Sequence, residues 1–420
     1  MEADQSESWR LPCIDLKALP KIDFMTNSQS PVDPQERYDF GRNWAKFSKA
    51  GLDDEARKNS REWLLRSLKL RSLEGRVFLD IGSGSGLHSL AAYQSGASEV
   101  ISFDYDPHSV ATTEKIRVAA GSPANWQVLR GSVLDGAFMQ DLPKADIVYS
   151  WGVLHHTGHV WEALRNAFVP LKPGGLALVA LYSTTCYENA ALHGWPSPEK
   201  WLQIKQRYNR ASSFQKLAME WHYVLTSGFG HSVWRLRTVF RSCLRALKES
   251  GSYRAKRGMH YWTDVRDWLG GWPMEFVHEN DVLQFCDQKF GLEWLDMRTG
   301  EGCTEYLLQK QNSKADWHPF HSKEKRKVLA APYNHKGGFA WEKEIRKANQ
   351  ESEGTFEKLQ LLENGRPLIK VGEPYEDSIR QLGRGRYMFK EKQLIFSSSD
   401  CTDPNGNGKT YEIRKTHFSS

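Results

Sequence analysis

The sequence predicts an α/β fold in which a parallel sheet is covered by helices on both faces. Five short apolar runs, typical of buried strands, alternate with stretches of helical periodicity. We expect the strands at residues 76–82, 99–105, 125–131, 146–152 and 175–183. We expect the helices between them at residues 86–95, 107–120 and 158–169. Ligands of such a fold bind outside the carboxyl ends of the strands, so the residues there are candidates for a functional site.

The composition is that of a globular protein with a mild charge excess. The chain has 420 residues, of which 26% are charged, and its formal net charge is +6. No apolar run approaches the length of a membrane-spanning helix, and the first residues are too acidic and polar for a signal peptide. The cysteines are scattered without a Cys-x-x-Cys pair, which argues against a zinc site. We therefore expect a cytoplasmic protein without a membrane span or a bound metal.

The first predicted strand leads into a glycine-rich loop. Residues 77–81 are apolar except for Asp80, and glycines follow at positions 82, 84 and 86. Glycine permits positive φ and a close approach of ligand to backbone, and the helix that follows offers unpaired N–H groups. The spacing differs from Gly-x-Gly-x-x-Gly, and the Asp80 carboxylate would repel a pyrophosphate but attract an ammonium group. The loop is either an ordinary strand-to-helix turn or a site for a ligand such as S-adenosylmethionine, which carries an ammonium group, a carboxylate and an adenosine.

A second acid supports the ligand-binding interpretation. Asp104 ends the second predicted strand, about twenty residues after the loop, where an acid can hold the hydroxyls of a ribose. Together with residues 146–156, Asp104 and the stretch from Asp80 to Gly86 resemble the class I S-adenosylmethionine-dependent methyltransferases. The resemblance is closest to the ubiquinone/menaquinone-type (methyltransferase type 11/25-like) group and covers roughly residues 37–310.

This resemblance implies a Rossmann-like class I methyltransferase sheet of seven strands, the last antiparallel. A helical insertion is expected after the fifth strand, and a small β-rich module at the C-terminus. The last two strands are expected at 292–299 and 304–310, after a helix at 279–290. The expected domains are an irregular arm (1–36), the cofactor-binding domain (37–183), a helical, Trp-rich substrate cap (184–278), the end of the sheet (279–310), a charged linker (311–358) and the β-rich module (359–420).

The insertion is rich in tryptophan. It holds seven of the chain's 16 tryptophans, and residues 256–273 mix hydrogen-bond donors, rings and glycines. The tryptophans either fill the core of a small helical layer or line a substrate site. The residues expected to contact the substrate are Trp44, Tyr182, His260, Trp262 and Asp264.

The C-terminal part of the chain differs in character. The linker is polar, with a helix expected at residues 341–350, and Asn364-Gly365 is a hairpin signal. Residues 403–408 match the first half of a calcium loop, but Arg414 stands where the bidentate acid should follow, so turn chemistry explains them better. We expect this module to bind a partner or a saccharide.

The family motifs imply a set of cofactor-binding residues. Arg42 is expected to pair with the methionine carboxylate, and Ser132 stands where many relatives have an acid beside the adenine. Ser132 and the main-chain N–H of Val133 can still bind the base. The full expected set is Arg42, Asp80, Gly82, Ser83, Gly84, Gly86, Asp104, Tyr105, Ser132, Val133 and Trp151.

Two histidines follow the fourth strand, next to the expected position of the transferred methyl group. Methyl transfer depends on in-line placement, and an oxygen acceptor also loses a proton, for which histidine is a suitable base. His155 and His156 are therefore the catalytic candidates. We expect one to face the methyl group and the other to brace the loop, with His155 preferred as the facing residue. With His159 they could instead suggest a metal, which no further ligand at a convincing spacing supports.

The sequence thus predicts methyl transfer to a small-molecule acceptor, at oxygen, under an aromatic cap. One alternative is an RNA methyltransferase, which is favoured if the basic residues 254–257 border the cleft. The absence of an Asn-Pro-Pro-Tyr-type motif after the fourth strand weakens that alternative. Another is a non-catalytic, cofactor-binding interaction subunit, which the intact cofactor residues disfavour.

Overall fold

The computed structural model divides the chain into two compact units. The first, here called the sheet unit, comprises Phe24–Trp317, and the second, the C-terminal unit, comprises Met1–Asp23 and His318–Ser420. The structure describes residues 38, 41, 54–192, 194–226, 261–300, 302–311, 326–345, 359–371, 376–390 and 393–415. Within those ranges, no helix combines the length and the apolar character needed to span a membrane.

A seven-stranded sheet with the order β3-β2-β1-β4-β5-β7-β6 forms the centre of the sheet unit. Its strands are β1 Val77–Ile81, β2 Glu99–Asp104, β3 Trp126–Arg130, β4 Ala145–Trp151, β5 Leu171–Tyr182, β6 Leu292–Thr299 and β7 Cys303–Lys310. Strands β1 to β5 pair in parallel, whereas β7 is antiparallel to both β5 and β6. The predicted fold class is confirmed, including the antiparallel last strand.

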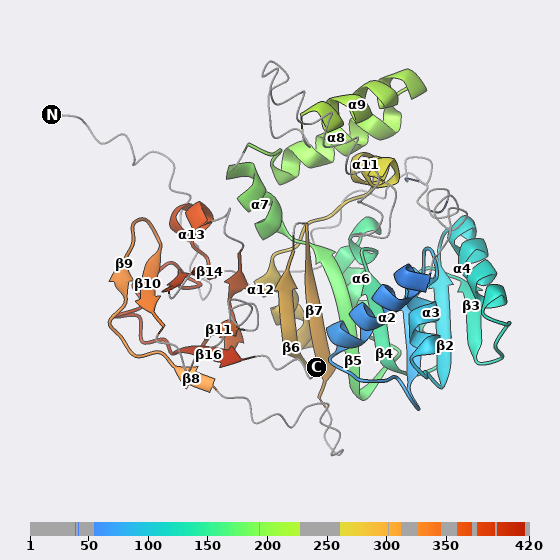
Figure 1. Cartoon of the computed structure of the whole chain (residues 1–420), viewed down its shortest axis with the longest axis horizontal. Helices are drawn as coiled ribbons and strands as arrows, with labels where there is room; N and C mark the ends of the chain where they lie inside the picture. Colours follow the sequence, from blue (N-terminus) through green and yellow to red (C-terminus); the bar gives the residue numbers. More distant parts are fainter. Residues whose placement is uncertain are drawn as a thin grey trace. The chain divides into compact units, whose positions relative to one another are not determined.

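Helices cover both faces of this sheet, with α2 and α3 in front and α6 and α12 behind in Figure 1. The helices that flank the sheet are α2 Asp54–Leu68, α3 Leu87–Gln94, α4 Pro107–Ala119, α5 Gly136–Asp141, α6 Val160–Ala167 and α12 Glu279–Phe290. The fully buried Leu64 and Leu68 of α2 pack with Phe78 of β1 and Tyr149 of β4 in one apolar cluster. Burial of these side chains holds α2 close to the carboxyl ends of the central strands.

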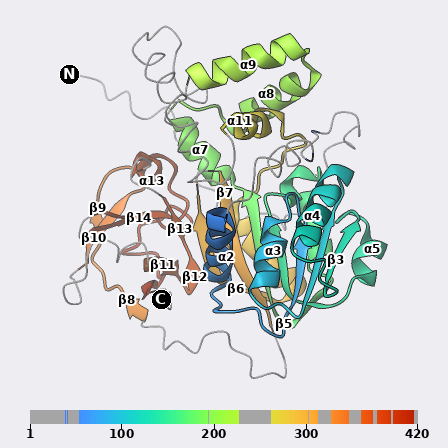
Figure 2. The same ribbon diagram turned by 45° about the vertical axis from the view of Figure 1, so that its right-hand side comes forward.

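The insertion after β5 leaves and rejoins the sheet at neighbouring points. It contains α7 Thr184–Leu192, α8 Pro198–Arg210, α9 Ser213–Leu225 and α11 Tyr261–Gly270, which Figures 1 and 2 show gathered at one end of the sheet. Ser183, where the chain leaves, forms a parallel bridge with Val277, where it returns. The buried Glu279 carboxylate accepts hydrogen bonds from the hydroxyls of Ser183, Thr185 (2.7 Å) and Thr304 (2.8 Å). These contacts fix the base of the insertion to the sheet.

The helices of the insertion have a small core of their own. Trp201, Tyr208, Val224 and Leu269 are buried in it. Trp201 therefore fills the core of a small helical layer, which was one of the two interpretations given for the tryptophans of the insertion. A lysine, Lys205, is also fully buried here and donates to the carbonyl of Trp268, and burial lowers the pKa of its ammonium group to about 7.

The C-terminal unit is β-rich, as predicted, and contains two sheets with the orders β13-β14-β15-β10-β9 and β12-β11-β16-β8. Its elements are β8 Arg326–Val328, β9 Asn334–His335, β10 Trp341–Glu344, β11 Leu359–Glu363, β12 Arg366–Pro367, β13 Ile369–Lys370, α13 Glu376–Leu382, β14 Arg386–Lys390, β15 Gln393–Phe396 and β16 Tyr411–Lys415. Asn364 and Gly365 both have positive φ, 49° and 77°, which is the conformation of the predicted Asn-Gly hairpin turn.

The helix predicted at 341–350 is wrong. Residues Trp341–Glu344 form β10, which pairs antiparallel with both β9 and β15, and the Trp341 ring packs on His335 with centroids 4.9 Å apart. Strand pairing with residues some fifty positions away overrides the local helical propensity. The predicted linker 311–358 is also too long, because β8, β9 and β10 belong to the two sheets of the C-terminal unit.

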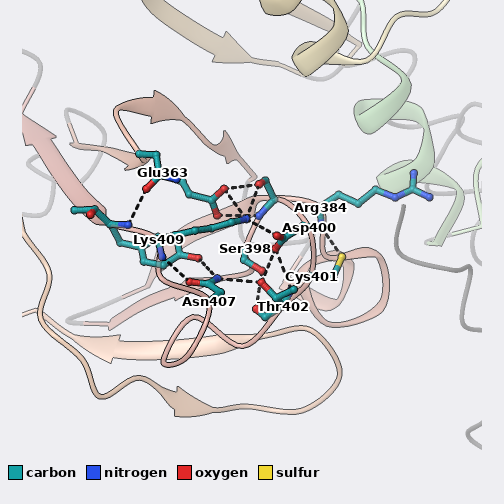
Figure 3. Close-up of polar contacts among 12 residues, drawn as sticks. Glu363, Arg384, Ser398, Asp400, Cys401, Thr402, Asn407 and Lys409 are labelled. Carbon is teal, nitrogen blue, oxygen red and sulfur yellow. Dashed lines mark hydrogen bonds and ion pairs between the residues drawn. The ribbon is translucent and has the colours of Figure 1, made fainter. Parts of the chain in front are cut away.

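A partly exposed ion-pair network ties the last loops of this unit together (Figure 3). The Lys409 ammonium group lies 3.1 Å from Glu363 Oε1 and 2.8 Å from Asp400 Oδ2. The hydroxyl of Thr402 donates to Asp400 Oδ1 (2.6 Å), and Asn407 Nδ2 donates to Thr402 Oγ1 (3.0 Å). Lys409 and the acids around it therefore hold the loop between β15 and β16 in one conformation.

The stretch that resembles half a calcium loop uses its polar side chains for this turn. Asp403 Oδ1 accepts from the Asn405 N–H (2.8 Å), and Asn405 Oδ1 accepts from the Tyr333 N–H (2.7 Å). Asn407 Oδ1 accepts from the Lys409 N–H (3.0 Å). These Asx-type contacts account for the Asp and Asn residues of the loop, as turn chemistry predicts.

Candidate functional site

A cavity of about 1040 Å³ lies at the carboxyl ends of the parallel strands. The loops after β1, β2, β3 and β4 line it, together with the end of α11 and the segment that follows that helix. This is the edge where a parallel α/β sheet binds its ligands.

The loop after β1 is shaped by glycines at two positions. Gly82 has φ +76°, and its N–H donates to the Phe103 carbonyl (2.8 Å). A Cβ at this position would lie 2.5 Å from the side chain of Val153, so no larger residue fits. Gly84 has φ +53°, and its N–H donates to Asp104 Oδ2 (3.0 Å). The glycines thus bring the backbone of the first loop against the acid at the end of β2.

Asp80 is positioned by a chain of buried hydrogen bonds, here called the Asp80 relay. Trp126 Nε1 donates to Ser102 Oγ (2.9 Å), Ser102 Oγ donates to Ser89 Oγ (2.7 Å), and Ser89 Oγ donates to Asp80 Oδ2 (2.5 Å). The chain has one direction, because an indole N–H can only donate and an ionised carboxylate can only accept. Each donor in the relay therefore favours the ionised form of Asp80.

Asp80, which is buried, and Asp104, which is half-buried, are two acids in one cavity. Burial raises the pKa of Asp80 to about 7, against the lowering effect of the Ser89 hydroxyl, and the nearby Asp104 raises it further. Burial likewise raises the pKa of Asp104 to about 6, although the N–H groups of Asp106 and Gly84 lower it. No basic side chain pairs with either carboxylate within the described part of the chain. The cavity therefore favours a ligand that brings a positive charge and hydrogen-bond donors.

The loops after β2 and β3 form the next part of the wall. Tyr105 lines the cavity with a largely exposed ring, and Ser132 and Val133 line it from the loop after β3. Ser132 Oγ accepts from the Leu134 N–H (3.2 Å). The neighbouring Asp135 caps α5, because its side chain accepts hydrogen bonds from the N–H groups of Ala137 and Phe138.

The two histidines after β4 have different environments. His155 is 0% exposed, and its Nδ1 accepts from the Tyr182 N–H (3.2 Å). Burial holds the pKa of His155 well below its usual value, and the charges of His156 and Lys205 act in the same direction. His156 is half-buried, and its Nδ1 donates to the Pro273 carbonyl (2.7 Å), which leaves Nε2 as the basic nitrogen of the neutral ring. Of the two predicted base candidates, His155 is thus fully buried and His156 the more exposed.

An aromatic wall lies on the side of the cavity formed by β4, which is separated from β3 by two strands in the order of the sheet. Its rings come from α2, α3 and β4. Trp63 meets Trp151 edge to face with centroids 6.3 Å apart, and Trp63 also contacts His88. His88 Nδ1 and the Tyr149 hydroxyl share a hydrogen bond (3.0 Å), and burial lowers the pKa of His88 to about 4, so this imidazole is neutral. These rings line the cavity together with Glu305 of β7.

Most predicted site residues that the structure describes lie in the cavity wall. They are Asp80, Gly82, Ser83, Gly84, Asp104, Tyr105, Ser132, Val133, Trp151, His155, His156 and Tyr182. Gly86 is set back from the wall. It is the N-cap of α3 with φ +76°, and a Cβ there would lie 2.9 Å from the Thr113 Cα, so this glycine permits close packing of α3 on α4.

None of the predicted substrate residues of the insertion lies in the described cavity wall. Trp262 packs on Trp221, with ring centroids 5.2 Å apart, in the helical layer rather than in the described cavity wall. Arg42, Trp44, His260 and the side chain of Asp264 lie outside the described residues. The cavity wall does contain residues from the end of the stretch 256–273, namely Asp267, Trp268, Trp272 and Pro273. The predicted substrate residues were instead in the middle of that stretch.

Trp63, Tyr149 and Glu305 are among the wall residues that sequence reasoning missed. Tyr149 and Trp151 are two apart on one strand and therefore share a face, which was a usable signal. Glu305 carried no local signal, because its position depends on how β7 pairs with β5. Among the described residues, no group of three or more histidines, cysteines and acids is arranged to hold a metal ion.

Comparisons with known proteins point to one domain type. Residues 54–246 match the family model described as a methyltransferase domain. The tRNA U34 carboxymethyltransferase of Saccharophagus degradans is 35% identical over 106 residues, which are 25% of this chain and 32% of that protein. The ribosomal protein L11 methyltransferase of Limosilactobacillus fermentum is 34% identical over 128 residues, 30% of this chain and 37% of that protein. The chain thus spans about a third of the length of these relatives.

Solved structures align over a larger share of the chain at low identity. A putative S-adenosyl-L-methionine-dependent methyltransferase from Methanococcus maripaludis covers 69% of this chain and 100% of its own, with 14% identity and a TM-score of 0.36. An O-methyltransferase family protein from Burkholderia thailandensis covers 64% of this chain and 63% of its own, with 13% identity and a TM-score of 0.36.

Proposed function

We propose that this chain, whose residues 54–246 match a methyltransferase domain, is a class I S-adenosylmethionine-dependent methyltransferase that transfers a methyl group to a small-molecule acceptor, at oxygen. The observation that carries the proposal is the pair of carboxylates, the buried Asp80 and the half-buried Asp104, in a cavity that also contains His156. Two acids without a basic partner among the described residues match a ligand with an ammonium group and a ribose.

The residues of the cavity fit S-adenosylmethionine. Asp80 would bind the ammonium group, Asp104 the ribose hydroxyls, and Ser132 with the Val133 N–H the adenine. When bound, this cofactor supplies an electrophilic methyl group on a sulfonium. The protein's own contribution is to hold the ligand by these groups and to keep the two carboxylates ionised, which the Asp80 relay and the N–H groups on Asp104 favour.

His156 is the proposed base. A hydroxyl acceptor gives up a proton, and the Nε2 of His156 can take it because the Pro273 carbonyl holds the other nitrogen protonated. His155 is proposed to brace the loop through its bond to the Tyr182 backbone. Tyr182 and Trp268, whose rings stack with centroids 6.1 Å apart, form a lid-side wall that excludes water from the reacting groups.

Charge favours a small molecule over a nucleic acid. The described wall carries five carboxylates and one guanidinium: Asp80, Asp104, Asp106, Asp267, Glu305 and Arg298. Arg298 is paired with Asp296 (3.3 Å), which Lys69 also contacts (3.3 Å), so the wall has one guanidinium against its five carboxylates. A polyanionic backbone would be repelled from such a cavity. RNA remains the second candidate acceptor, because the relative from Saccharophagus degradans is by name a tRNA carboxymethyltransferase.

We further propose roles for the remaining parts of the chain. The insertion between Ser183 and Val277 acts as a substrate cap, since its α11 end lines the cavity and its base is fixed by Glu279. The C-terminal unit is proposed to contact a partner or a saccharide, and the protein to act in the cytoplasm.

The test is methyl transfer from cofactor labelled in its methyl group, with the full-length protein. One reaction contains a pool of small metabolites and another contains total tRNA. The proposal predicts incorporation of label in the first pool, and none with the Asp104→Asn variant. Label in the tRNA pool alone would replace the small-molecule proposal with the RNA alternative, and no label in either would contradict both.

A further inference from the structure

We propose that Trp151 and Glu305 form the acceptor subsite and select a planar aromatic acceptor that carries a positive charge or a hydrogen-bond donor. This inference rests on the proposed methyl-transfer function, because it assigns the part of the same cavity that the cofactor-binding residues do not use. It also moves Trp151 from the cofactor-binding set, where the sequence placed it, to the acceptor.

Trp151 presents an open aromatic face that is held in place. It is the last residue of β4, it lines the cavity, and its side chain is 43% exposed. Its indole Nε1 donates to Glu305 Oε1 (3.0 Å), and its ring meets the edge of Trp63 with centroids 6.3 Å apart. A ring fixed at two points and open on one face suits stacking of a planar ligand, because little side-chain entropy is lost on binding.

Glu305 lies beside this ring by the pairing of the sheet. Trp151 is opposite Ala180 of β5, and Ala180 is opposite Glu305 of β7, so both side chains emerge on the same face of three adjacent strands. Burial raises the pKa of the Glu305 carboxyl, against the effects of Trp151 and Arg298. Within the described residues, its one hydrogen bond is the one to Trp151, made by Oε1. A second donor to this carboxylate must therefore come from a ligand or from water.

The surroundings of the pair decide the chemistry of the acceptor. His88, which contacts Trp63, is neutral, because burial lowers its pKa to about 4. The Arg298 guanidinium lines the same cavity and is ion-paired with Asp296, which also contacts Lys69. A tryptophan face and a partly desolvated carboxylate attract a cation or an N–H donor on an aromatic ring, and they repel an anion.

Three probes separate the two features in protein saturated with S-adenosylhomocysteine. Tyramine has an aromatic ring and an ammonium group, 4-hydroxyphenylacetate has the ring with a carboxylate, and 4-(2-aminoethyl)cyclohexanol has the ammonium group without the ring. We expect tyramine to bind about tenfold more tightly than either of the others, measured by ligand-observed NMR titration.

Two variants should remove one preference each. Glu305→Gln should abolish the preference for tyramine over 4-hydroxyphenylacetate but keep the preference for the aromatic ring. Trp151→Ala should abolish the preference for tyramine over the cyclohexanol. Trp151→Phe keeps an aromatic face and should keep that preference, which gives a second reading if the alanine variant is unstable. The controls Trp195→Ala and Glu293→Gln change exposed residues outside the described cavity wall and should leave both preferences intact.

The outcomes distinguish this inference from the function on which it rests. Equal affinity for the three probes or no binding of tyramine would overturn the subsite while S-adenosylhomocysteine still binds. So would an unchanged preference in Glu305→Gln or Trp151→Ala, or loss of the ring preference in Trp151→Phe. Failure of the wild-type protein to bind S-adenosylhomocysteine would instead overturn the proposed function.

Discussion

Replacing Asp80 by asparagine should make the ligand-free protein more stable and its cofactor affinity weaker. Asp80 is 2% exposed, and the Ser89 hydroxyl donates to it (2.5 Å). Asparagine has nearly the same volume, and its carbonyl oxygen can accept the same hydrogen bond. The substitution therefore removes the buried charge with little change in packing.

The size of the effect follows from the pKa of Asp80, which burial raises from 3.8 to about 7. Between these two values the folded protein holds a proton that the unfolded chain has lost, so the stability contributed by this group is present below pH 3.8 and is lost as the pH rises through about 7. Between pH 5 and pH 9 the wild-type protein should lose about 3 kcal/mol of unfolding free energy through this one group. The Asp80→Asn variant has no such loss.

The assay is urea unfolding at pH 5 and at pH 9, followed by tryptophan fluorescence. All of the 16 tryptophans except Trp9 and Trp341 belong to the sheet unit, so the signal reports that unit. The stability of Asp80→Asn relative to wild type should rise by about 3 kcal/mol from the lower to the higher pH. The variant Asp141→Asn removes an exposed acid and serves as the control for net charge. The same pH dependence in Asp80→Asn and wild type would refute the reasoning.

Three further predictions concern the relay, the base and the domain boundary. Ser89→Ala removes a hydrogen bond that lowers the pKa of Asp80. As the pH is lowered, S-adenosylhomocysteine binding, titrated by calorimetry, should therefore begin to weaken at a higher pH in the variant than in wild type. Identical pH profiles would contradict this. His156→Ala should slow methyl transfer by on the order of 10²–10⁴ without changing S-adenosylhomocysteine affinity, whereas His155→Ala should mainly lower the melting temperature; full single-turnover rates in His156→Ala would place the base elsewhere. A chain that ends at Trp317 should bind S-adenosylhomocysteine as the full chain does, because the cavity lies within one compact unit; loss of binding in a folded truncated chain would show that the C-terminal unit completes the site.

The parts of the fold that were predictable from sequence are those with local signals. The strand–loop–helix unit around Asp80 is encoded by an apolar run, glycines at alternate positions and a helical stretch in direct succession. β1 Val77–Ile81 and α3 Leu87–Gln94 lie within a residue or so of the expected positions. The antiparallel last strand followed from the family pattern rather than from local propensity.

The parts that were not predictable depend on contacts between distant residues. Trp341 was placed in a helix because its pairing with Phe396 leaves no trace in the neighbouring sequence. The orientation of His156 is set by the carbonyl of Pro273, which is 117 positions away. Glu305 reaches the cavity through the register of β7 on β5. Sequence patterns identified the glycine-rich loop of the cavity wall, but the positions of His156 and Glu305 in that wall depend on the tertiary fold.

The central claim is that Asp104 and the loop after β1 bind the adenosine part of S-adenosylmethionine. The most direct measurement is calorimetric titration of S-adenosylhomocysteine into the wild-type protein and into Asp104→Asn at pH 8. Asp104 accepts from Gly84 (3.0 Å) and Asp106 (2.9 Å), and the loss of its charge should weaken binding by about ten- to a hundredfold. Saturable binding to the wild type with that loss in the variant is the predicted result. No binding to the wild type, or equal affinity in a folded variant, would contradict the claim.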